Sequence, residues 1–215
     1  ENEALSRFFM DLTDIWIERG YREGVKLGPI DQLVAHFSGE QSCLPCIWQS
    51  NCVDEFIAID ARGFVAQCDC WVTSYPEYFF GNIFEWDSLS ELLKNSPARK
   101  EFVERPQAII DQDCSECDYL SMCHGGCPVR TYTIKHTLLE KDPYCHLYKS
   151  LFRHTEGVAA RLAGRDFLPG ASLKARTGSG NGKSCGSAKA DGLQAWQASP
   201  LAQTLVQIER RRVAP

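Results

Sequence analysis

The chain has 215 residues and a formal net charge of −5, and 44% of its residues are hydrophobic. This length and apolar content allow one domain with a buried core and additional segments. Lysines and arginines do not gather with aromatic residues, which argues against nucleic-acid binding, and no apolar run approaches the roughly 18 residues of a membrane span.

Residues 1–40 predict two helices. Apolar residues recur at the spacing of an amphipathic helix that ends near Gly20: Leu5, Phe8, Phe9, Leu12, Ile15 and Trp16. A second helix is expected from about Gly28 to Phe37, with Gly39 at its end. Its apolar residues are Ile30, Leu33, Val34 and Phe37. We expect the apolar residues of both helices to pack in the core.

A β-hairpin is predicted in the next segment. Residues 56–59 have the composition of a strand, residues 60–63 that of a turn, and residues 64–68 that of the returning strand. Gly63 can adopt the positive φ that a tight turn needs. The hairpin is expected to bring Cys68 back toward Cys52.

Further helices are predicted on both sides of a cysteine-rich loop. Ser88 and Glu91 form a capping box before a short helix, and Pro97 is expected to begin another that runs through Phe102 and Val103. Residues 114–127 are rich in Gly, Ser and Asp and predict a loop. One helical face is expected after them: Tyr144, Leu147, Tyr148, Leu151 and Phe152.

The composition changes from about Gly164 onward. Residues 170–192 contain many Gly, Ser, Ala and Lys residues, which is typical of a linker or a disordered segment. Residues 193–212 predict an isolated helix that ends in three arginines, and Cys185 stands alone in this tail, away from any ligand pattern.

Cysteines are the most informative residues of this chain. There are 11 of them, and their odd number and close spacing argue against a secreted disulfide framework. Thiolates that bind metal in a reducing compartment fit the pattern better, so we expect a cytoplasmic protein.

Most of these cysteines lie in two blocks. The first is Cys46-x5-Cys52-x10-Gly63-x4-Cys68, and the second is Cys114-x2-Cys117-x5-Cys123-x3-Cys127, followed by Cys145. Eight thiolates suffice for two four-cysteine metal centres. Iron–sulfur clusters and structural zinc both use such sets, and the spacing alone leaves both open.

The two blocks resemble the SPASM domain, the C-terminal auxiliary-cluster domain of radical S-adenosylmethionine enzymes. The segments 52–68 and 114–127 and Cys145 match its pattern, and Cys46 matches a further ligand of anaerobic sulfatase-maturating enzymes. The resemblance covers roughly residues 1–155. It implies an α+β fold, in which the C-terminal end of a partial (β/α) barrel precedes a loop-rich domain with a β-hairpin and helices around two clusters.

The resemblance also implies which cysteines share a cluster. Auxiliary cluster I, a [4Fe–4S] cluster, would be held by Cys46, Cys52, Cys68 and Cys127. Auxiliary cluster II, also [4Fe–4S], would be held by Cys114, Cys117, Cys123 and Cys145. The ligands of the two clusters would therefore interleave along the chain.

Other residues near the ligands have several possible roles. The resemblance makes Asp69 a candidate general base that takes the substrate proton, whereas the simpler alternative is a solvated or capping aspartate. Cys43 and Cys70 are ligand alternatives or small buried residues. His124 could donate a hydrogen bond to a cluster sulfur or be an ordinary loop histidine.

The Cys-x3-Cys-x2-Cys motif that holds the catalytic cluster of these enzymes does not occur in the sequence. S-adenosylmethionine and a third [4Fe–4S] cluster are therefore expected in an N-terminal part outside this chain, which should be inactive alone. We expect residues 1–40 to be the last helices of the truncated barrel, residues 41–163 to be the SPASM domain, and residues 164–215 to be a linker and a possible isolated helix.

Two functions remain open from the sequence. The first is the C-terminal part of an enzyme that oxidises or crosslinks a peptide or protein, with short stretches at 81–83, 96–99 and 124–127 that resemble maturases of ribosomally made peptides. Its partners would be that substrate and an electron donor such as a flavodoxin or ferredoxin. The alternative is a stand-alone iron–sulfur or zinc module that binds a partner or relays electrons.

Overall fold

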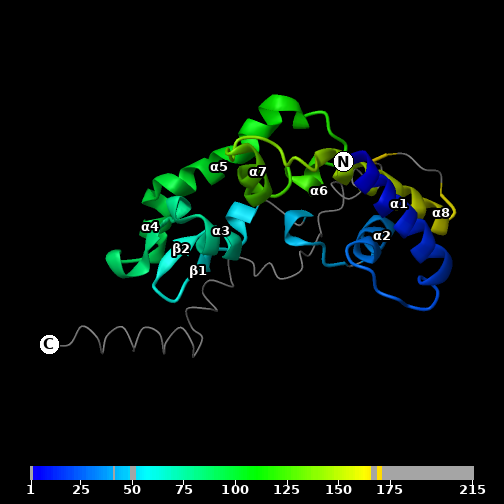
Figure 1. Cartoon of the computed structure of the whole chain (residues 1–215), viewed down its shortest axis with the longest axis horizontal. Coiled ribbons are helices and arrows are strands. Elements are labelled where there is room, and N and C mark those ends of the chain that lie inside the picture. Colours follow the sequence, from blue (N-terminus) through cyan, green and yellow to red (C-terminus); the bar gives the residue numbers. More distant parts are fainter. Residues whose placement is uncertain (1, 41, 49–51, 166–168, 171–215) are drawn as a thin grey trace. The chain divides into compact units, whose positions relative to one another are not determined.

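The computed structural model describes residues 2–40, 42–48, 52–165 and 169–170, which all belong to the compact unit Glu1–Gly182. They are mainly helical, with one small three-stranded antiparallel sheet (Figure 1). No helix in this part of the chain is long and apolar enough to cross a membrane. The expected tail helix, and the expected linker apart from Gly170, lie outside the described residues.

Helix α2 (Ile30–Ser38) matches its prediction closely. The four apolar residues expected in the core are all buried: Ile30, Leu33, Val34 and Phe37. Gly39 ends the helix with a φ of 87°, and its amide donates a hydrogen bond of 3.1 Å to the His36 carbonyl. Glycine adopts this left-handed conformation without the steric cost of a Cβ, which explains why the helix ends here.

Helix α1 (Asn2–Arg19) forms as predicted, but the expected burial of its apolar face is wrong in part. Leu5, Phe8 and Ile15 are 37%, 57% and 50% exposed. Trp16 is buried as expected, Phe9 and Leu12 pack partly buried against the core, and the other buried residues are Ser6 and Thr13. The hydroxyls of Ser6 and Thr13 donate to carbonyls one turn earlier, at 2.8 and 2.7 Å, so these small side chains can be buried without losing hydrogen bonds.

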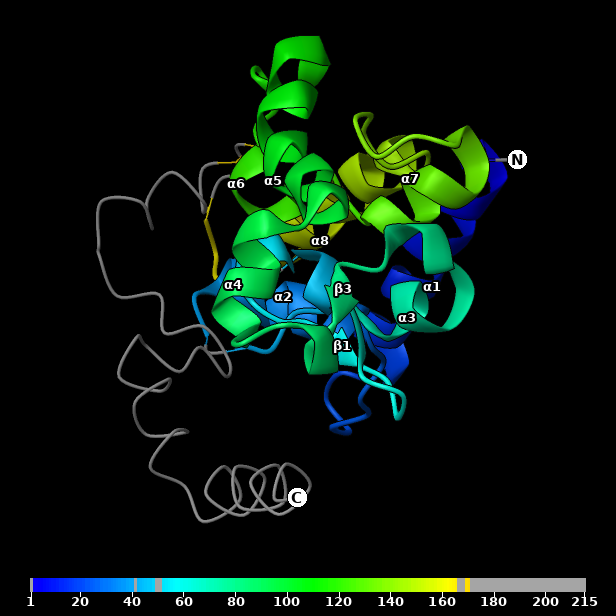
Figure 2. The same ribbon diagram turned by 90° about the vertical axis from the view of Figure 1, so that its left-hand side faces the viewer.

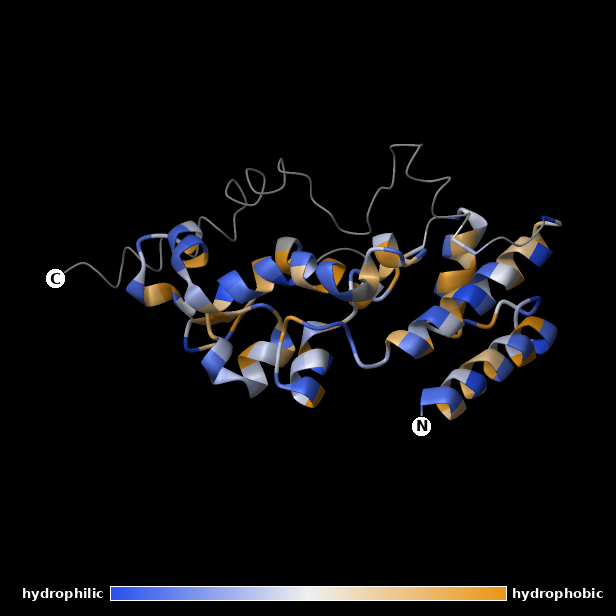
Figure 3. Cartoon of the chain, turned by 90° about the horizontal axis from the view of Figure 1, so that it is seen from above, coloured by the Kyte–Doolittle hydropathy of each residue, from blue (hydrophilic) through white to orange (hydrophobic). Residues whose placement is uncertain are grey.

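The buried face of α1 packs against α8 (Cys145–Leu162), as does α2. The small side chains of Ser6 and Thr13 permit close packing, and Trp16 packs in the same core, whereas the exposed apolar residues Leu5, Phe8 and Ile15 do not. Figure 3 shows hydrophilic and hydrophobic residues in succession along the helix that begins at the N label. The periodicity identified the helix and only part of its buried face.

The first hydrophobic core lies among α1, α2, α8 and the short 3-10 helix η1 (Cys46–Trp48). Trp48 packs edge-on against Phe152 with ring centroids 4.9 Å apart, and Tyr119 packs on the same ring at 5.6 Å. Cys117 and Cys123 border this core, so two of the predicted ligands lie beside it.

The predicted hairpin is present, but its strands are shorter than expected. β1 (Ala58–Ile59) pairs antiparallel with β2 (Phe64–Ala66), and Ile59 faces Val65. The returning strand does not reach Cys68, which instead begins α3 (Asp69–Ser74) as its N-cap residue. A third strand, β3 (Gly81–Asn82), pairs with β2 and was not predicted (Figure 2).

The second hydrophobic core lies between this sheet and the helices α3, α4 (Leu89–Asn95), α5 (Pro97–Ile109) and α7 (Pro128–Lys135). Trp71 is fully buried there and packs edge-on against Phe102 at 5.0 Å. The helix starts were predicted correctly, because the Ser88 hydroxyl accepts a hydrogen bond of 3.2 Å from the Glu91 amide. Between these helices run the 3-10 helices η3 (Pro76–Tyr78) and η4 (Ile83–Glu85).

The second cysteine block is more helical than predicted. α5 continues into a π-helical turn, η5 (Ile110–Cys114), and after a turn the chain forms α6 (Leu120–Cys123) and then α7. Single π-helical turns occur frequently at functional sites. The prediction of a loop was correct for most of residues 115–127 and wrong for α6, because composition does not report a helix of four residues.

Candidate metal centres

Four cysteines from separate elements line one cavity of the structure: Cys114, Cys117, Cys123 and Cys145. Cys114 ends η5, Cys123 ends α6, and Cys145 is the first residue of α8. The cavity wall also includes Asp142 and the aromatic rings of Tyr119 and Tyr148. These are the four cysteines that the resemblance assigns to a single centre, although they span 32 positions of the sequence from 114 to 145.

The thiols around this cavity raise one another's pKa. Burial, and then the nearby Cys145 and Cys117 thiolates, together raise the pKa of Cys123 to about 12. Like charges that are close together and away from water disfavour ionisation. Four such thiolates would therefore need a bound cation, which is the situation that a metal centre provides.

Two cysteines of the first block, Cys46 and Cys52, interact electrostatically with Cys127 of the second block. Burial raises the pKa of Cys52 to about 11, and the charges of Cys127 and Cys46 act in the same direction. Burial and then Cys127 raise the pKa of Cys46, while Arg130 opposes this rise. Cys127, which lies in the second block of the sequence, thus approaches two cysteines of the first block.

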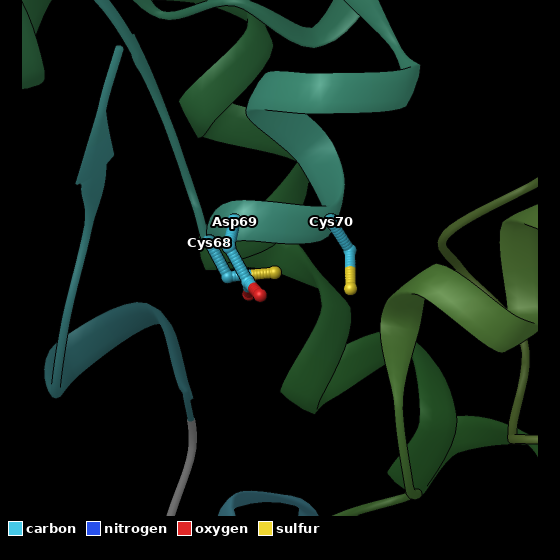
Figure 4. A group of neighbouring side chains, drawn as sticks. All are labelled: Cys68, Asp69 and Cys70. Atoms are coloured by element: carbon cyan, nitrogen blue, oxygen red, sulfur yellow. The ribbon is translucent and has the colours of Figure 1, made fainter.

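Cys68, the fourth residue of this predicted set, lies in a different group. Burial raises the pKa of Cys68 to about 12, and its nearest charged neighbours are Cys70 and Asp69. The sulfurs of Cys68 and Cys70 and a carboxylate oxygen of Asp69 lie within 4.8 Å of one another at the start of α3 (Figure 4). Asp69 also acts on the charge of Cys46, so the two groups are neighbours.

Three predicted ligands lie where a helix begins. Cys68 and Cys127 are the N-cap residues of α3 and α7, and Cys145 is the first residue of α8. The free amides and the positive end of the helix dipole favour a negative charge at this position. The amides of Trp71 and Cys70 lower the pKa of Cys68 in this way, against the larger effect of burial.

Asp69 is exposed on the first turn of α3, with its carboxylate beside the two sulfurs (Figure 4). The carboxylate is therefore accessible to water. His124 instead caps α6 in a left-handed conformation with a φ of 50°, and burial lowers its pKa. Its Nε2 atom is buried without a hydrogen-bond partner among the described residues.

Among the described residues, the eight predicted ligands and the exposed Cys70 are not joined in disulfides. Cys43 is disulfide-bonded, so it is not a spare ligand here, and the prediction against disulfides does not hold for this residue. Thiolate sets of this kind are suited to iron–sulfur clusters and to zinc. The residues present therefore fit two four-cysteine centres, most completely around the cavity.

Sequence reasoning missed a buried arginine between the two sets. Arg105 is 4% exposed and donates hydrogen bonds to the carbonyls of Leu138 and Glu140, and to that of Gly125 at 2.9 Å. Burial lowers the pKa of Arg105, and the neighbouring thiolates and Asp142 counteract this. A signal was present in the sequence, because Arg105 has the helical spacing of the buried Phe102 and Ile109.

Asp142 was also missed. Its side chain is only 1% exposed and pairs with Arg130 at 3.1 Å. Part of its hydrogen bonding is local, to Tyr144 and Tyr148. Its bonds to Cys127 and Arg130 form only in the tertiary structure, which is why the residue was missed.

Comparison with known proteins identifies related enzymes. The chain is 27% identical over 77% of its length to a serine-type anaerobic sulfatase-maturating enzyme of Bacteroides thetaiotaomicron. It is 25% identical over 69% of its length to a cysteine-type anaerobic sulfatase-maturating enzyme of Clostridium perfringens. An uncharacterised protein of Archaeoglobus fulgidus is 34% identical over 42% of the chain. No protein-family model matches the chain.

Solved structures show the same relationship at the level of fold. Native anSMEcpe with bound AdoMet has a TM-score of 0.53 and 21% identity, over 77% of this chain and 44% of that one. The same enzyme with bound AdoMet and the Cp18Cys peptide has a TM-score of 0.53 and 22% identity, over 76% of this chain. The described fold therefore matches part of an anaerobic sulfatase-maturating enzyme.

The chain is homologous, at low identity, to anaerobic sulfatase-maturating enzymes, which are radical S-adenosylmethionine enzymes that modify peptides. It spans about two fifths of their length, since the two matches cover 37% and 39% of those proteins.

Proposed function

We propose that the chain is the C-terminal auxiliary-cluster part, a SPASM domain, of a radical S-adenosylmethionine enzyme that modifies a peptide or protein. The observation that carries this proposal is the cavity that Cys114, Cys117, Cys123 and Cys145 line together. The packing of an apolar core does not by itself require four thiols around one cavity. Homology to sulfatase-maturating enzymes supports the same function from an independent direction.

In this proposal the cavity cysteines hold one [4Fe–4S] cluster, and Cys46, Cys52, Cys68 and Cys127 hold the other. Bound clusters supply one-electron transfer close to the substrate. The protein contributes thiolates, helix N-termini that stabilise their charge, and aromatic rings that limit access of water to the cavity. For the second set, Cys68 must approach the three cysteines that already lie together, and its place at the start of α3 makes this a local adjustment.

Asp69 is the proposed proton acceptor of the reaction. Its carboxylate is exposed beside two cysteine sulfurs, so it can reach a bound substrate and water. A carboxylate there can take the proton that a substrate loses as its electron leaves toward the centre. Loss of the electron and of the proton together leaves the substrate without a net change in charge, and the Asp69 side chain holds the proton.

The remaining parts of the proposal concern partners. The substrate is a peptide or protein segment, and the electron donor is a small carrier such as a flavodoxin or ferredoxin. S-adenosylmethionine and a third [4Fe–4S] cluster belong to a part of the enzyme outside this chain. The exposed thiols and the expected clusters favour the reducing, cytoplasmic compartment.

The proposal is tested by anaerobic reconstitution of the chain with iron and sulfide. We expect about eight irons per chain, as two [4Fe–4S] clusters require. The variant Cys70→Ala serves as a control that should retain the full iron content, because the exposed Cys70 is not a proposed ligand. Stoichiometric zinc without iron in protein purified anaerobically would instead favour a structural zinc module.

A further inference from the structure

Asp142 receives an unusual number of hydrogen bonds for one buried side chain. Its Oδ2 atom accepts from the Cys127 amide at 2.8 Å, from Arg130 Nε at 3.1 Å and from the Tyr148 hydroxyl at 3.1 Å. Its Oδ1 atom accepts from the Tyr144 amide at 2.9 Å. Four donors around a carboxylate that is 1% exposed define a single, fixed orientation for this group.

The main chain of Asp142 makes two more hydrogen bonds. Its carbonyl accepts a hydrogen bond of 3.0 Å from the Cys145 amide, and its own amide donates one of 2.8 Å to the Gly125 carbonyl. Cys127 belongs to one proposed set of ligands and Cys145 to the other. A single residue therefore holds the backbone of one ligand from each set.

The turn at Gly125 and Gly126 is fixed by hydrogen bonds from Asp142 and from Arg105. Arg105 donates to the same Gly125 carbonyl, at 2.9 Å. Gly125 and Gly126, which connect Cys123 to Cys127, have φ angles of 79° and 76°. A Cβ on Gly126 would lie 2.3 Å from the Cβ of Asp142, so only glycine allows this approach.

We propose that Asp142 is a positioning residue that couples the two metal centres by fixing Cys127 and Cys145 together. This inference rests on the proposed function where it takes these cysteines as ligands of two centres. The buried carboxylate also places one negative charge between the centres, balanced by Arg130 and by the more distant Arg105. A change at Asp142 should therefore affect both centres, whereas the loss of a single ligand should affect one.

If Asp142 only stabilised the fold, its substitution would have different effects. Loss of a buried anchor would lower the free energy of unfolding but would leave the reduction potentials of correctly assembled clusters unchanged. Removal of a negative charge near both clusters favours their reduced, more negative states and raises both potentials. The potentials thus distinguish a positioning and charge-setting role from an anchoring role.

The test compares Asp142→Asn with the matched control Glu140→Gln. Glu140 lies two residues earlier, and its carboxylate, 45% exposed, pairs with Lys135 at 2.6 Å. In the metal-free chain, amide hydrogen exchange at Cys127 should become roughly fivefold faster or more in Asp142→Asn, because the acceptor loses its charge. After reconstitution, both midpoint potentials should shift upward in Asp142→Asn and remain unchanged in Glu140→Gln.

Each outcome decides a separate question. If the wild-type chain takes up no iron, the proposed function fails, and amide hydrogen exchange at Cys127 in the metal-free chain still tests the positioning role. Unchanged exchange at Cys127 in a folded Asp142→Asn chain, or a shift of only one potential, would overturn the inference.

A second variant covers the case in which Asp142→Asn does not fold. Tyr148→Phe removes one donor from the carboxylate and keeps the charge and the ring. The less neutralised carboxylate should shift both potentials downward, while the Cys127 amide stays protected. Two unchanged potentials in Tyr148→Phe would again contradict a charge that acts on both centres.

Discussion

The phenol of Tyr119 donates a hydrogen bond of 2.9 Å to the Oε2 atom of Glu156 inside the first hydrophobic core. Glu156 is 4% exposed, and the same oxygen accepts a bond of 2.8 Å from the Gly170 amide. Burial, and then the bond to Glu156, raise the pKa of Tyr119 above its usual range, so the phenol remains a protonated donor. The buried carboxylate thus depends on donors from two distant segments.

Tyr119→Phe should lower the free energy of unfolding by about 1–3 kcal/mol. The ring is kept, but a buried acceptor on Glu156 loses one of its donors, so its desolvation is offset less. Denaturant unfolding followed by circular dichroism measures this difference. Tyr21→Phe, at a residue that is 41% exposed, is the matched control and should change stability little. Equal stability of the two variants would contradict this account of Tyr119.

Gly63→Ala should destabilise the hairpin more than Gly39→Ala destabilises the end of α2. The two glycines have nearly identical φ angles of 88° and 87°, so the backbone strain, roughly 1–2 kcal/mol, is shared. A Cβ on Gly63 would also lie 2.6 Å from Phe84, whereas a Cβ on Gly39 meets nothing within 4 Å. Thermal unfolding of both variants measures the difference in stability that the contact with Phe84 causes. A smaller loss of stability in Gly63→Ala than in Gly39→Ala would show that the Phe84 ring moves aside freely.

The elements that could be predicted from the sequence are those with local causes. Ser88 and Ser96 accept hydrogen bonds from Glu91 and Arg99 within their own helix starts, and Gly39 ends α2 with its own backbone angles. The buried face of α1 has a non-local cause, because it depends on the packing of α8. β3 is likewise too short to be recognised without its pairing to β2.

In the candidate site, too, only part could be predicted from the sequence. The spacing of cysteines identified the candidate ligands, and the resemblance to the SPASM domain grouped the four that line the cavity. The resemblance also grouped Cys68 with Cys46, Cys52 and Cys127, and in the structure the Cys68 sulfur lies within 4.8 Å of Asp69 and Cys70. Asp142 was not predicted, because its bonds to Cys127 and Arg130 form only after two segments of the chain have folded together.

Cys127→Ala and Cys145→Ala should each remove a different centre. Cys127 lies with Cys46 and Cys52, so its loss should lower iron by about four atoms and leave the signal of the cavity centre intact. Cys145→Ala should have the opposite selectivity, because Cys145 lines the cavity. Iron analysis with electron paramagnetic resonance of the reduced chains separates the two cases. If Cys127→Ala perturbs only the cavity centre, the interleaved assignment is wrong.

Asp69→Asn tests the proposed proton acceptor in an enzyme that includes this chain together with its S-adenosylmethionine-binding part. The asparagine keeps the shape of the side chain but cannot take a proton at neutral pH, so product formation should fall by roughly 10²-fold or more. Iron content and S-adenosylmethionine cleavage should remain, because the thiols beside Asp69 are unchanged. Asp87→Asn, at another exposed aspartate, is the control for a charge lost elsewhere on the surface. Undiminished product would make Asp69 an ordinary surface residue, and loss of iron would show that its carboxylate supports the neighbouring cysteines instead.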